Sequence, residues 1–239
     1  MTREIKILPT VTTTAYYGSD WESKTKEIKK LGIKEVAVFP TCLDIEKRKK
    51  FYRLLEKSGI KNIPFVHLRS DMRVEELDYF VKNFNTCVFC IHTAREFPFV
   101  YDYSKYKKMI YIENIYFPLN KEELGNFGGV CVDFSHLEND KLFCEEKFKH
   151  NTKTIEKFSV GCNHISVIKN KVYIDTENRF EKAGCRRDYH QLEKLSELDY
   201  LKRYPLKYFS SYIAIELENS LEEQLEAGEY VRKIINRLR

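Results

Sequence analysis

The sequence predicts an α/β fold: a single (β/α)8 TIM barrel domain over residues 1–239, with a small hairpin inserted after the seventh strand. Short strand-like runs alternate with amphipathic helical stretches from end to end, at a spacing of about 25 residues. Strands that alternate with helices pair in parallel through right-handed crossovers, and eight such units in 239 residues fit this barrel. A doubly wound parallel sheet is the structural alternative.

The elements follow one another in regular order. The expected strands lie at residues 5–9, 35–39, 63–67, 87–92, 109–114, 129–134, 161–168 and 212–216. The expected helices lie near residues 19–31, 45–58, 74–84, 121–124, 140–158, 189–203 and 221–238, and only an irregular aromatic stretch follows the fourth strand. Ser19 and Asp44 are expected N-caps, and Gly32 and Gly59 are expected C-caps.

One segment interrupts the alternation after the seventh strand. Residues 169–187 contain the run Val172-Tyr173-Ile174 and turn-prone residues at 175–178, which predict a small hairpin before the next helix. No linker, low-complexity segment or repeat divides the sequence.

Composition narrows the class of protein. The chain is 43% apolar and 32% charged, with a net charge of +5, and no apolar run approaches the roughly 20 residues that a bilayer crossing needs. The first residues lack the apolar core of a secretory signal, so we expect a soluble, cytoplasmic protein with no membrane or protein partner. The mild positive charge permits a phosphate-bearing substrate without implying one.

The seven cysteines are odd in number, and most of them stand in apolar runs, which is typical of reduced core thiols. Cys87 and Cys90 form a CxxC motif, but side chains three apart in a strand point to opposite faces, so we expect no zinc or redox site from this pair.

Metal-ligating residue types stand where the predicted strands end, which is where an active site is built in this barrel. Of the six histidines, four stand at or just past a strand end and one in the loop before the seventh helix; His150 is left over, in a polar helix where we expect it to be solvated. The strand-end residues are His67, His92, Glu113, Asp133 with His136, His164 and Glu216, and the loop before the seventh helix adds Asp188 and His190.

Three of these residues are carboxylates that interrupt apolar strands: Glu113, Asp133 and Glu216. A carboxylate buried there without a partner costs several kcal/mol or is forced to protonate. No basic residue occurs inside these strands, so the remaining partner is a multivalent cation. A mixed set of imidazoles and carboxylates suits zinc, manganese or iron, and suits calcium or magnesium poorly.

Taken in order, these nine residues resemble the ligand set of the endonuclease IV family (AP endonuclease family 2), within the xylose isomerase-like TIM barrels. The segment Gly184-Cys185-Arg186-Arg187-Asp188-Tyr189-His190 is similar to the loop that supplies ligands to the third metal of that family. The likeness covers strands three to eight as scattered positions in the right order.

The resemblance implies two to three zinc ions, with manganese or iron as alternatives, that activate hydroxide to cleave a phosphodiester, for which the family's substrate is DNA with abasic sites. Glu113, Asp133 and Glu216 would be the catalytic carboxylates, with Glu113 bridging two ions. By this resemblance, the first ion would take His67, His92 and Glu113; the second Glu113, Asp133, His164 and Glu216; and the third His136, Asp188 and His190.

Two segments depart from the family pattern. The loop after His67 reads Leu68-Arg69-Ser70-Asp71-Met72, where the family carries an aromatic and an aliphatic wedge that open DNA, and residues 165–169 replace a polar stretch. The resemblance therefore supports the metal chemistry better than it supports abasic DNA as the substrate.

The candidate phosphate contacts are Arg69, Arg95, Lys169, Arg186 and Arg187. The aromatic residues Tyr16 and Tyr17 and residues 97–101 could stack on a base or pack at the barrel rim.

Three functions remain open. The first is a metal-dependent phosphodiesterase similar to endonuclease IV. The second is a sugar isomerase or epimerase of the same superfamily, with one ion held by Glu113, Asp133, His164 and Glu216, for which His67, His92, Asp188 and His190 would be superfluous. The third is a nucleic-acid-binding barrel that holds metals for structure only.

Overall fold

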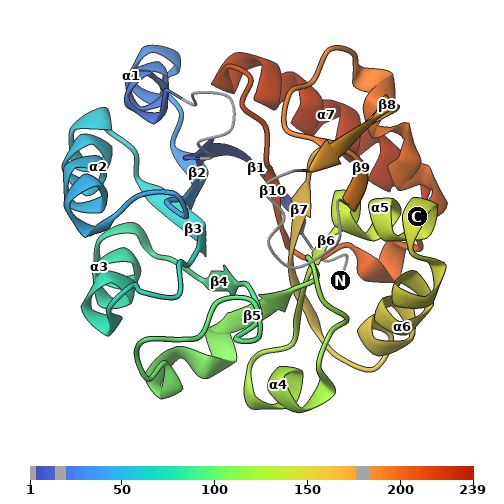
Figure 1. The fold of residues 1–239 in the computed structure, drawn as a ribbon. Coiled ribbons are helices and arrows are strands. Elements are labelled where there is room, and N and C mark those ends of the chain that lie inside the picture. Colours follow the sequence, from blue (N-terminus) through green and yellow to red (C-terminus); the bar gives the residue numbers. More distant parts are fainter. Residues whose placement is uncertain (1–3, 14–19, 176–183) are drawn as a thin grey trace.

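The computed structural model describes residues 4–13, 20–175 and 184–239. Eight parallel strands close into a barrel in the order β1-β10-β7-β6-β5-β4-β3-β2, and helices surround them (Figure 1). The barrel strands are β1 (Lys6–Thr12), β2 (Glu35–Phe39), β3 (Asn62–His67), β4 (Val88–Ile91), β5 (Ile110–Glu113), β6 (Val130–Asp133), β7 (Val160–Ile165) and β10 (Tyr212–Ile215). The predicted TIM barrel is confirmed, and the doubly wound sheet is excluded.

Helices connect most of these strands and cover the outside of the barrel (Figure 1). The α-helices are α1 (Trp21–Leu31), α2 (Ile45–Ser58), α3 (Val74–Phe84), α4 (Lys121–Asn126), α5 (Phe134–Phe143), α6 (Glu145–Ile155) and α7 (Leu221–Arg237). Short 3-10 helices are η1 (Ser104–Met109), η2 (Leu195–Arg203) and η3 (Leu206–Tyr208). No helix in the described ranges is long and apolar enough to cross a membrane.

The predicted hairpin after the seventh barrel strand is confirmed. Strands β8 (Val167–Asp175) and β9 (Gly184–Tyr189) pair antiparallel and form a separate two-stranded sheet. The pairing sets Val167 opposite Tyr189 and Ile168 opposite Asp188. The insertion therefore brings Asp188 back toward the end of β7.

The predicted caps Asp44, Gly32 and Gly59 are confirmed, since Asp44 accepts from the Lys47 amide and both glycines are left-handed, with φ of 65° and 82°. Ser19 lies outside the described residues, and Asp20 caps α1.

Two predicted helices were wrong. The helix expected at 140–158 is two helices, because the backbone of Cys144 is not helical, with φ of −144° and ψ of 74°, and separates α5 from α6. The first of the two also begins earlier than expected, since Asp133 caps it directly at the end of β6. The helix expected at 189–203 starts only at Leu195 and is 3-10, since Tyr189 belongs to β9.

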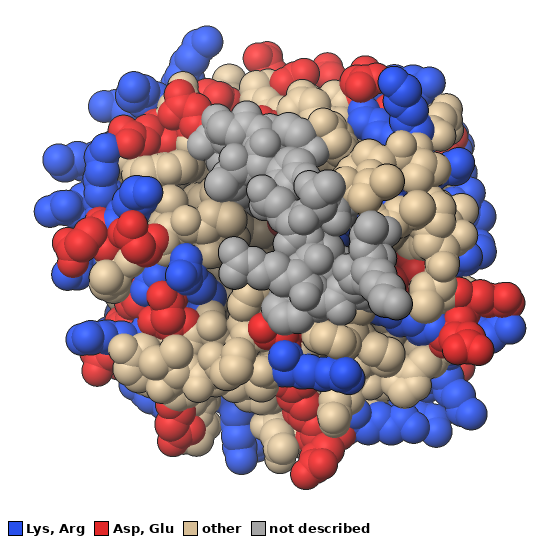
Figure 2. Space-filling view, in the orientation of Figure 1, with Lys and Arg blue, Asp and Glu red and all other residues tan. Residues whose placement is uncertain are grey.

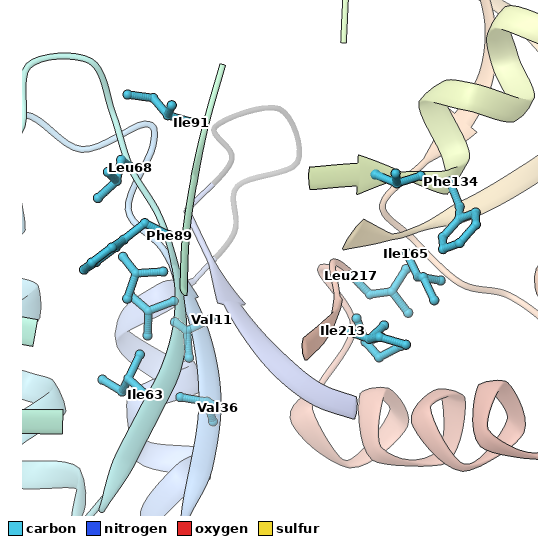
Figure 3. Close-up of a cluster of buried hydrophobic side chains, with 14 of the residues drawn as sticks. Val11, Val36, Ile63, Leu68, Phe89, Ile91, Phe134, Ile165, Ile213 and Leu217 are labelled. Carbon is cyan, nitrogen blue, oxygen red and sulfur yellow. The ribbon is translucent and has the colours of Figure 1, made fainter. Parts of the chain in front are cut away.

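The strands place alternate residues on two faces. Residues that point outward pack against the helices, and Figure 3 shows Val36, Ile63 and Phe89 on one side of the barrel and Ile165 and Ile213 on another. A second, smaller apolar layer fills the barrel interior. It contains Leu8, Ala37, Phe39, Phe65, Val88, Cys90, Cys131, Cys162 and Ala214.

Charged side chains gather around the rim of the face in view, over the outer helices, in both signs (Figure 2). Among the described residues, the lysine and arginine side chains on this face are thus dispersed and form no single basic stripe.

Candidate metal centre

Six of the eight barrel strands place metal-ligating side chains above the apolar interior layer, at the C-terminal end of the barrel. Glu113 and Asp133 are the last residues of β5 and β6, and His67 is the last residue of β3. His164 lies in β7, while His92 and Glu216 directly follow β4 and β10. Of these six residues all but His92 are buried, and His92 is partly buried.

Glu113 lies at the centre of this cluster. Its Oε2 is 2.9 Å from Nε2 of His67 and 3.5 Å from Nδ1 of His164, and its Oε1 is 3.4 Å from Nδ1 of His136. Burial opposes ionisation of Glu113, yet the imidazoles of His164, His136 and His67 hold its pKa well below the usual range. One carboxylate therefore faces imidazoles from three different elements.

Three of the imidazoles are oriented by backbone carbonyls. His67 Nδ1 lies 2.9 Å from the carbonyl of Leu68, His136 Nδ1 lies 3.2 Å from that of Asn114, and His190 Nδ1 lies 3.0 Å from that of Glu216. An imidazole that donates from Nδ1 to a carbonyl presents the lone pair of Nε2 on the other side of the ring. This is the arrangement by which metal-binding histidines are held in place.

Two buried polar atoms of the cluster lack hydrogen-bond partners among the described residues: Oδ2 of Asp133 and Nδ1 of His164. They lie 3.7 Å apart, and Oε2 of Glu216 is 3.4 Å from the same His164 nitrogen. An orphaned buried polar atom costs about 1–3 kcal/mol. A cation that both atoms coordinate would satisfy them, so the residues fit a metal ion.

The ligand atoms fall into overlapping groups, each with its atoms within 4.8 Å of one another. Glu113, Asp133 and His164 each belong to two groups. The groups are His67, Cys90, Glu113 and His164; Glu113, Asp133 and His136; and Asp133, His164 and Glu216. The last group contains most of the ligand set predicted for the second ion.

The other predicted ligands are arranged differently. His92 Nε2 is 3.6 Å from Oε2 of Glu113, and burial lowers the pKa of His92 to about 3, which leaves its imidazole neutral. Both oxygens of Asp188 accept hydrogen bonds from Arg186, while Asp188 Oδ2 lies 3.7 Å from His136 Nε2. His190 Nδ1 lies 4.0 Å from Oε1 of Glu216. A third ion at Asp188 would have to displace the Arg186 guanidinium.

Four of the five basic side chains predicted to contact phosphate divide into two pairs. Lys169 is held by Glu193 and Glu197, and Arg186 by Asp188, so both are engaged with acids. Arg69 also pairs with an acid, Asp71 at 3.0 Å, but these side chains are 40% and 38% exposed, so water screens the ion pair. Arg187 has a buried Nε without a hydrogen-bond partner in the described ranges. Arg69 and Arg187 are therefore the better candidates for anion contacts.

Aromatic side chains after β4 flank the cluster. Phe97 is exposed, and its ring lies 5.3 Å from that of His92. Arg95 stacks on Phe117 at 3.9 Å and lines a cavity of about 650 Å³ together with Thr93 and His150. Of the predicted stacking residues, Tyr16 and Tyr17 lie outside the described residues.

Cys90 belongs to the cluster, and sequence reasoning missed it. Its Sγ lies 3.1 Å from Nε2 of His164. Only three of the seven cysteines are buried, so the expectation that most are core thiols was wrong. The signal that could have found Cys90 is its position two residues before His92, on the same face of a strand that carries a predicted ligand.

No family model matches the chain, and no curated protein does. Several solved structures are similar to it. A xylose isomerase domain protein from Alicyclobacillus acidocaldarius is 11% identical, covering 97% of this chain and 99% of its own, with a TM-score of 0.44. An AP endonuclease of family 2 from Brucella melitensis is 12% identical, covering 92% and 96%, with a TM-score of 0.44. A phospho-2-dehydro-3-deoxyheptonate aldolase from Thermotoga maritima is 11% identical, covering 99% and 70%, with a TM-score of 0.48.

Proposed function

We propose that this protein is a metal-dependent hydrolase that cleaves phosphodiesters, with at least two zinc ions at the C-terminal end of the barrel. The observation that carries the proposal is the shared position of Glu113. Its Oε2 lies 2.9 Å from His67 on one side and 3.5 Å from His164 on the other, and His164 in turn faces Asp133 and Glu216. A carboxylate between two groups of ligands is suited to bridge two ions.

The net charge of the cluster supports a site with two ions. Asp188 is already neutralised by Arg186, so the uncompensated carboxylates are Glu113, Asp133 and Glu216. One divalent ion would leave this set with about one negative charge, whereas two ions leave about one positive charge. A site that is positive when loaded favours an anionic substrate such as a phosphodiester.

When bound, the ions would polarise a phosphoryl oxygen and lower the pKa of a water molecule toward 7. The chain itself supplies the geometry. The carbonyls of Leu68, Asn114 and Glu216 hold the imidazoles in one orientation, and the Ser135 hydroxyl and the His136 amide hold Oδ1 of Asp133. Arg69 and Arg187 would then orient the phosphate.

The substrate we propose is a single-stranded or small phosphodiester. Extruding a nucleotide from a duplex costs a few kcal/mol per unstacked step, which a wedge must offset. In the loop after His67, Leu68 and Met72 are buried, so neither can enter DNA. Phe97 and Tyr101, both exposed after β4, could stack on a splayed base.

The test is a side-by-side assay of zinc-loaded protein on abasic duplex DNA, abasic single-stranded DNA and a chromogenic phosphodiester. Hydrolysis of the latter two, with weak duplex cleavage, is the expected result. Glu216→Gln should abolish turnover, while Glu123→Gln is a matched control, since its amide oxygen can still accept from the Ala94 amide as Glu123 does at 2.7 Å. Preference for the duplex would contradict the proposed substrate, and no hydrolysis of any of the three would contradict the function.

The second candidate is a sugar isomerase with a single ion. The observation that favours it is the engagement of Lys169 and Arg186 with acids, which removes two of the expected phosphate contacts. The group Asp133, His164 and Glu216 could hold such an ion alone. Metal content separates the two candidates, because an isomerase of this kind needs one ion and has no use for His67.

A further inference from the structure

Three buried cysteines form a layer directly beneath the metal centre. Cys90, Cys131 and Cys162 are fully buried inside the barrel, on β4, β6 and β7, and all three are free thiols. Each stands two residues before a predicted ligand: Cys90 before His92, Cys131 before Asp133, and Cys162 before His164. Because strand side chains alternate between faces, each thiol lies on the same inward face as its ligand, about 6–7 Å further down the strand.

Of the three thiols, Cys90 alone enters a ligand group among the described residues. Its Sγ lies 3.1 Å from Nε2 of His164 and within 4.8 Å of ligand atoms of His67 and Glu113. Cys131 and Cys162 enter none of the ligand groups found among the described residues. Cys90 therefore differs from Cys131 and Cys162 in its membership of a ligand group, although all three thiols are equally buried.

The distances between the candidate ligand atoms fit tetrahedral coordination of a zinc ion. Zinc–sulfur and zinc–nitrogen bonds of about 2.3 and 2.0 Å at tetrahedral angles place two ligand atoms about 3.3–3.5 Å apart. The His67–Glu113 distance of 2.9 Å is close to these values, and Cys90 Sγ lies within 4.8 Å of the ligand atoms of both residues. Small outward shifts of the side chains would accommodate an ion.

We propose that Cys90 is a thiolate ligand of the ion held by His67 and Glu113. This inference rests on the proposed metal centre and adds a ligand that the nine predicted residues do not include. On binding, the S–H bond of Cys90 breaks and a metal–sulfur bond forms, with the proton released to solvent. A thiolate makes the site softer, so it selects zinc over manganese and magnesium. Its negative charge also brings the two-ion site from about one positive charge to about neutral.

The competing role for Cys90 is to accept a hydrogen bond from Nε2–H of His164 while Nδ1 alone binds metal, as an outer partner that orients the ligand. In that role the sulfur never touches the ion. Spectroscopy of the metal–sulfur bond distinguishes the two roles, whereas loss of activity in a cysteine variant does not.

The experiment is cobalt substitution of the full chain with wild type, Cys90→Ser and Cys162→Ser, the last being an equally buried thiol on a neighbouring part of the interior. We expect a thiolate-to-cobalt charge-transfer band in the near ultraviolet that is lost in Cys90→Ser and kept in Cys162→Ser. Zinc X-ray absorption of the wild type should show a sulfur neighbour at about 2.3 Å, a measurement that does not depend on any variant folding.

The outcomes separate this inference from the proposed function. Bound metal without a sulfur neighbour overturns the role of Cys90 and leaves the hydrolase proposal intact. A band lost in Cys162→Ser but kept in Cys90→Ser overturns it as well. Absence of any bound metal overturns both proposals together.

Discussion

Asp133 accepts the backbone N–H of His136 through Oδ1 at 2.8 Å, so the residue that ends β6 also caps α5. The Ser135 hydroxyl donates to the same oxygen at 2.6 Å, whereas Oδ2 has no hydrogen-bond partner among the described residues. The two oxygens of this carboxylate thus have separate roles, one in holding a helix and one at the metal centre.

Asp133→Asn should separate these roles. The amide oxygen can replace Oδ1 at the cap, while the amide nitrogen cannot coordinate a cation, so we expect metal-free stability near that of wild type and zinc affinity at least 10-fold lower. Asp133→Ala also loses the helix cap, so its free energy of unfolding should be about 1 kcal/mol lower than that of wild type. Chemical denaturation and zinc titration measure both effects, and an Asn variant as unstable as the Ala variant would contradict the division.

Glu113→Gln should remove more than one equivalent of metal, because a bridging carboxylate serves two ions. Turnover should fall below detection in the same variant. Elemental analysis after dialysis gives the metal content, with Glu123→Gln as a control carboxylate that accepts a backbone hydrogen bond from Ala94. Full metal retention in Glu113→Gln would show that the residue does not bridge.

Arg186→Gln tests the pairing with Asp188. The variant leaves a buried carboxylate without its charged partner, so metal-free protein should lose about 3 kcal/mol of stability. Added zinc should restore part of this loss through His136, Asp188 and His190. If His190→Ala in the same background abolishes the restoration, the three residues form a third site; restoration that persists would place the ion elsewhere.

Glu96 should make stability depend on pH. Burial raises its pKa to about 7, against hydrogen bonds from the amides of Tyr116 and Phe117, which lower it. The folded state therefore holds this proton more tightly than the unfolded state, and the resulting stability, up to about 3 kcal/mol, is present below about pH 4.5 and is lost as the pH rises to 7.

Glu96→Gln mimics the protonated form and should lack this decline. Denaturation of metal-free protein at pH 4.5 and pH 8 measures it, with the exposed Glu46→Gln as control. If the free energy of unfolding changes by the same amount between pH 4.5 and pH 8 in Glu96→Gln and in wild type, the raised pKa of Glu96 is contradicted.

The barrel was predictable because its signals are local. The alternation of apolar runs with amphipathic stretches marked all eight barrel strands, and Asp44, Gly32 and Gly59 marked helix ends. The start of α5 was missed because Asp133 acts both as a strand-end ligand and as an N-cap, and only the first role was considered.

The composition of the site was predictable only in part. Strand ends placed His67, Glu113, Asp133, His164 and Glu216 together, since parallel strands carry their last residues to one rim. The Arg186–Asp188 pair and the approach of Cys90 to His164 depend on how β9 and the barrel interior pack, which spacing along the chain does not specify.

Metal content tests the central claim most directly. Purified protein, saturated with zinc, dialysed and analysed by plasma mass spectrometry against protein concentration, should hold at least two ions per chain. Two ions are expected because Glu113 faces both His67 and His164, at 2.9 and 3.5 Å. A single ion at saturation would contradict the shared carboxylate and favour the isomerase.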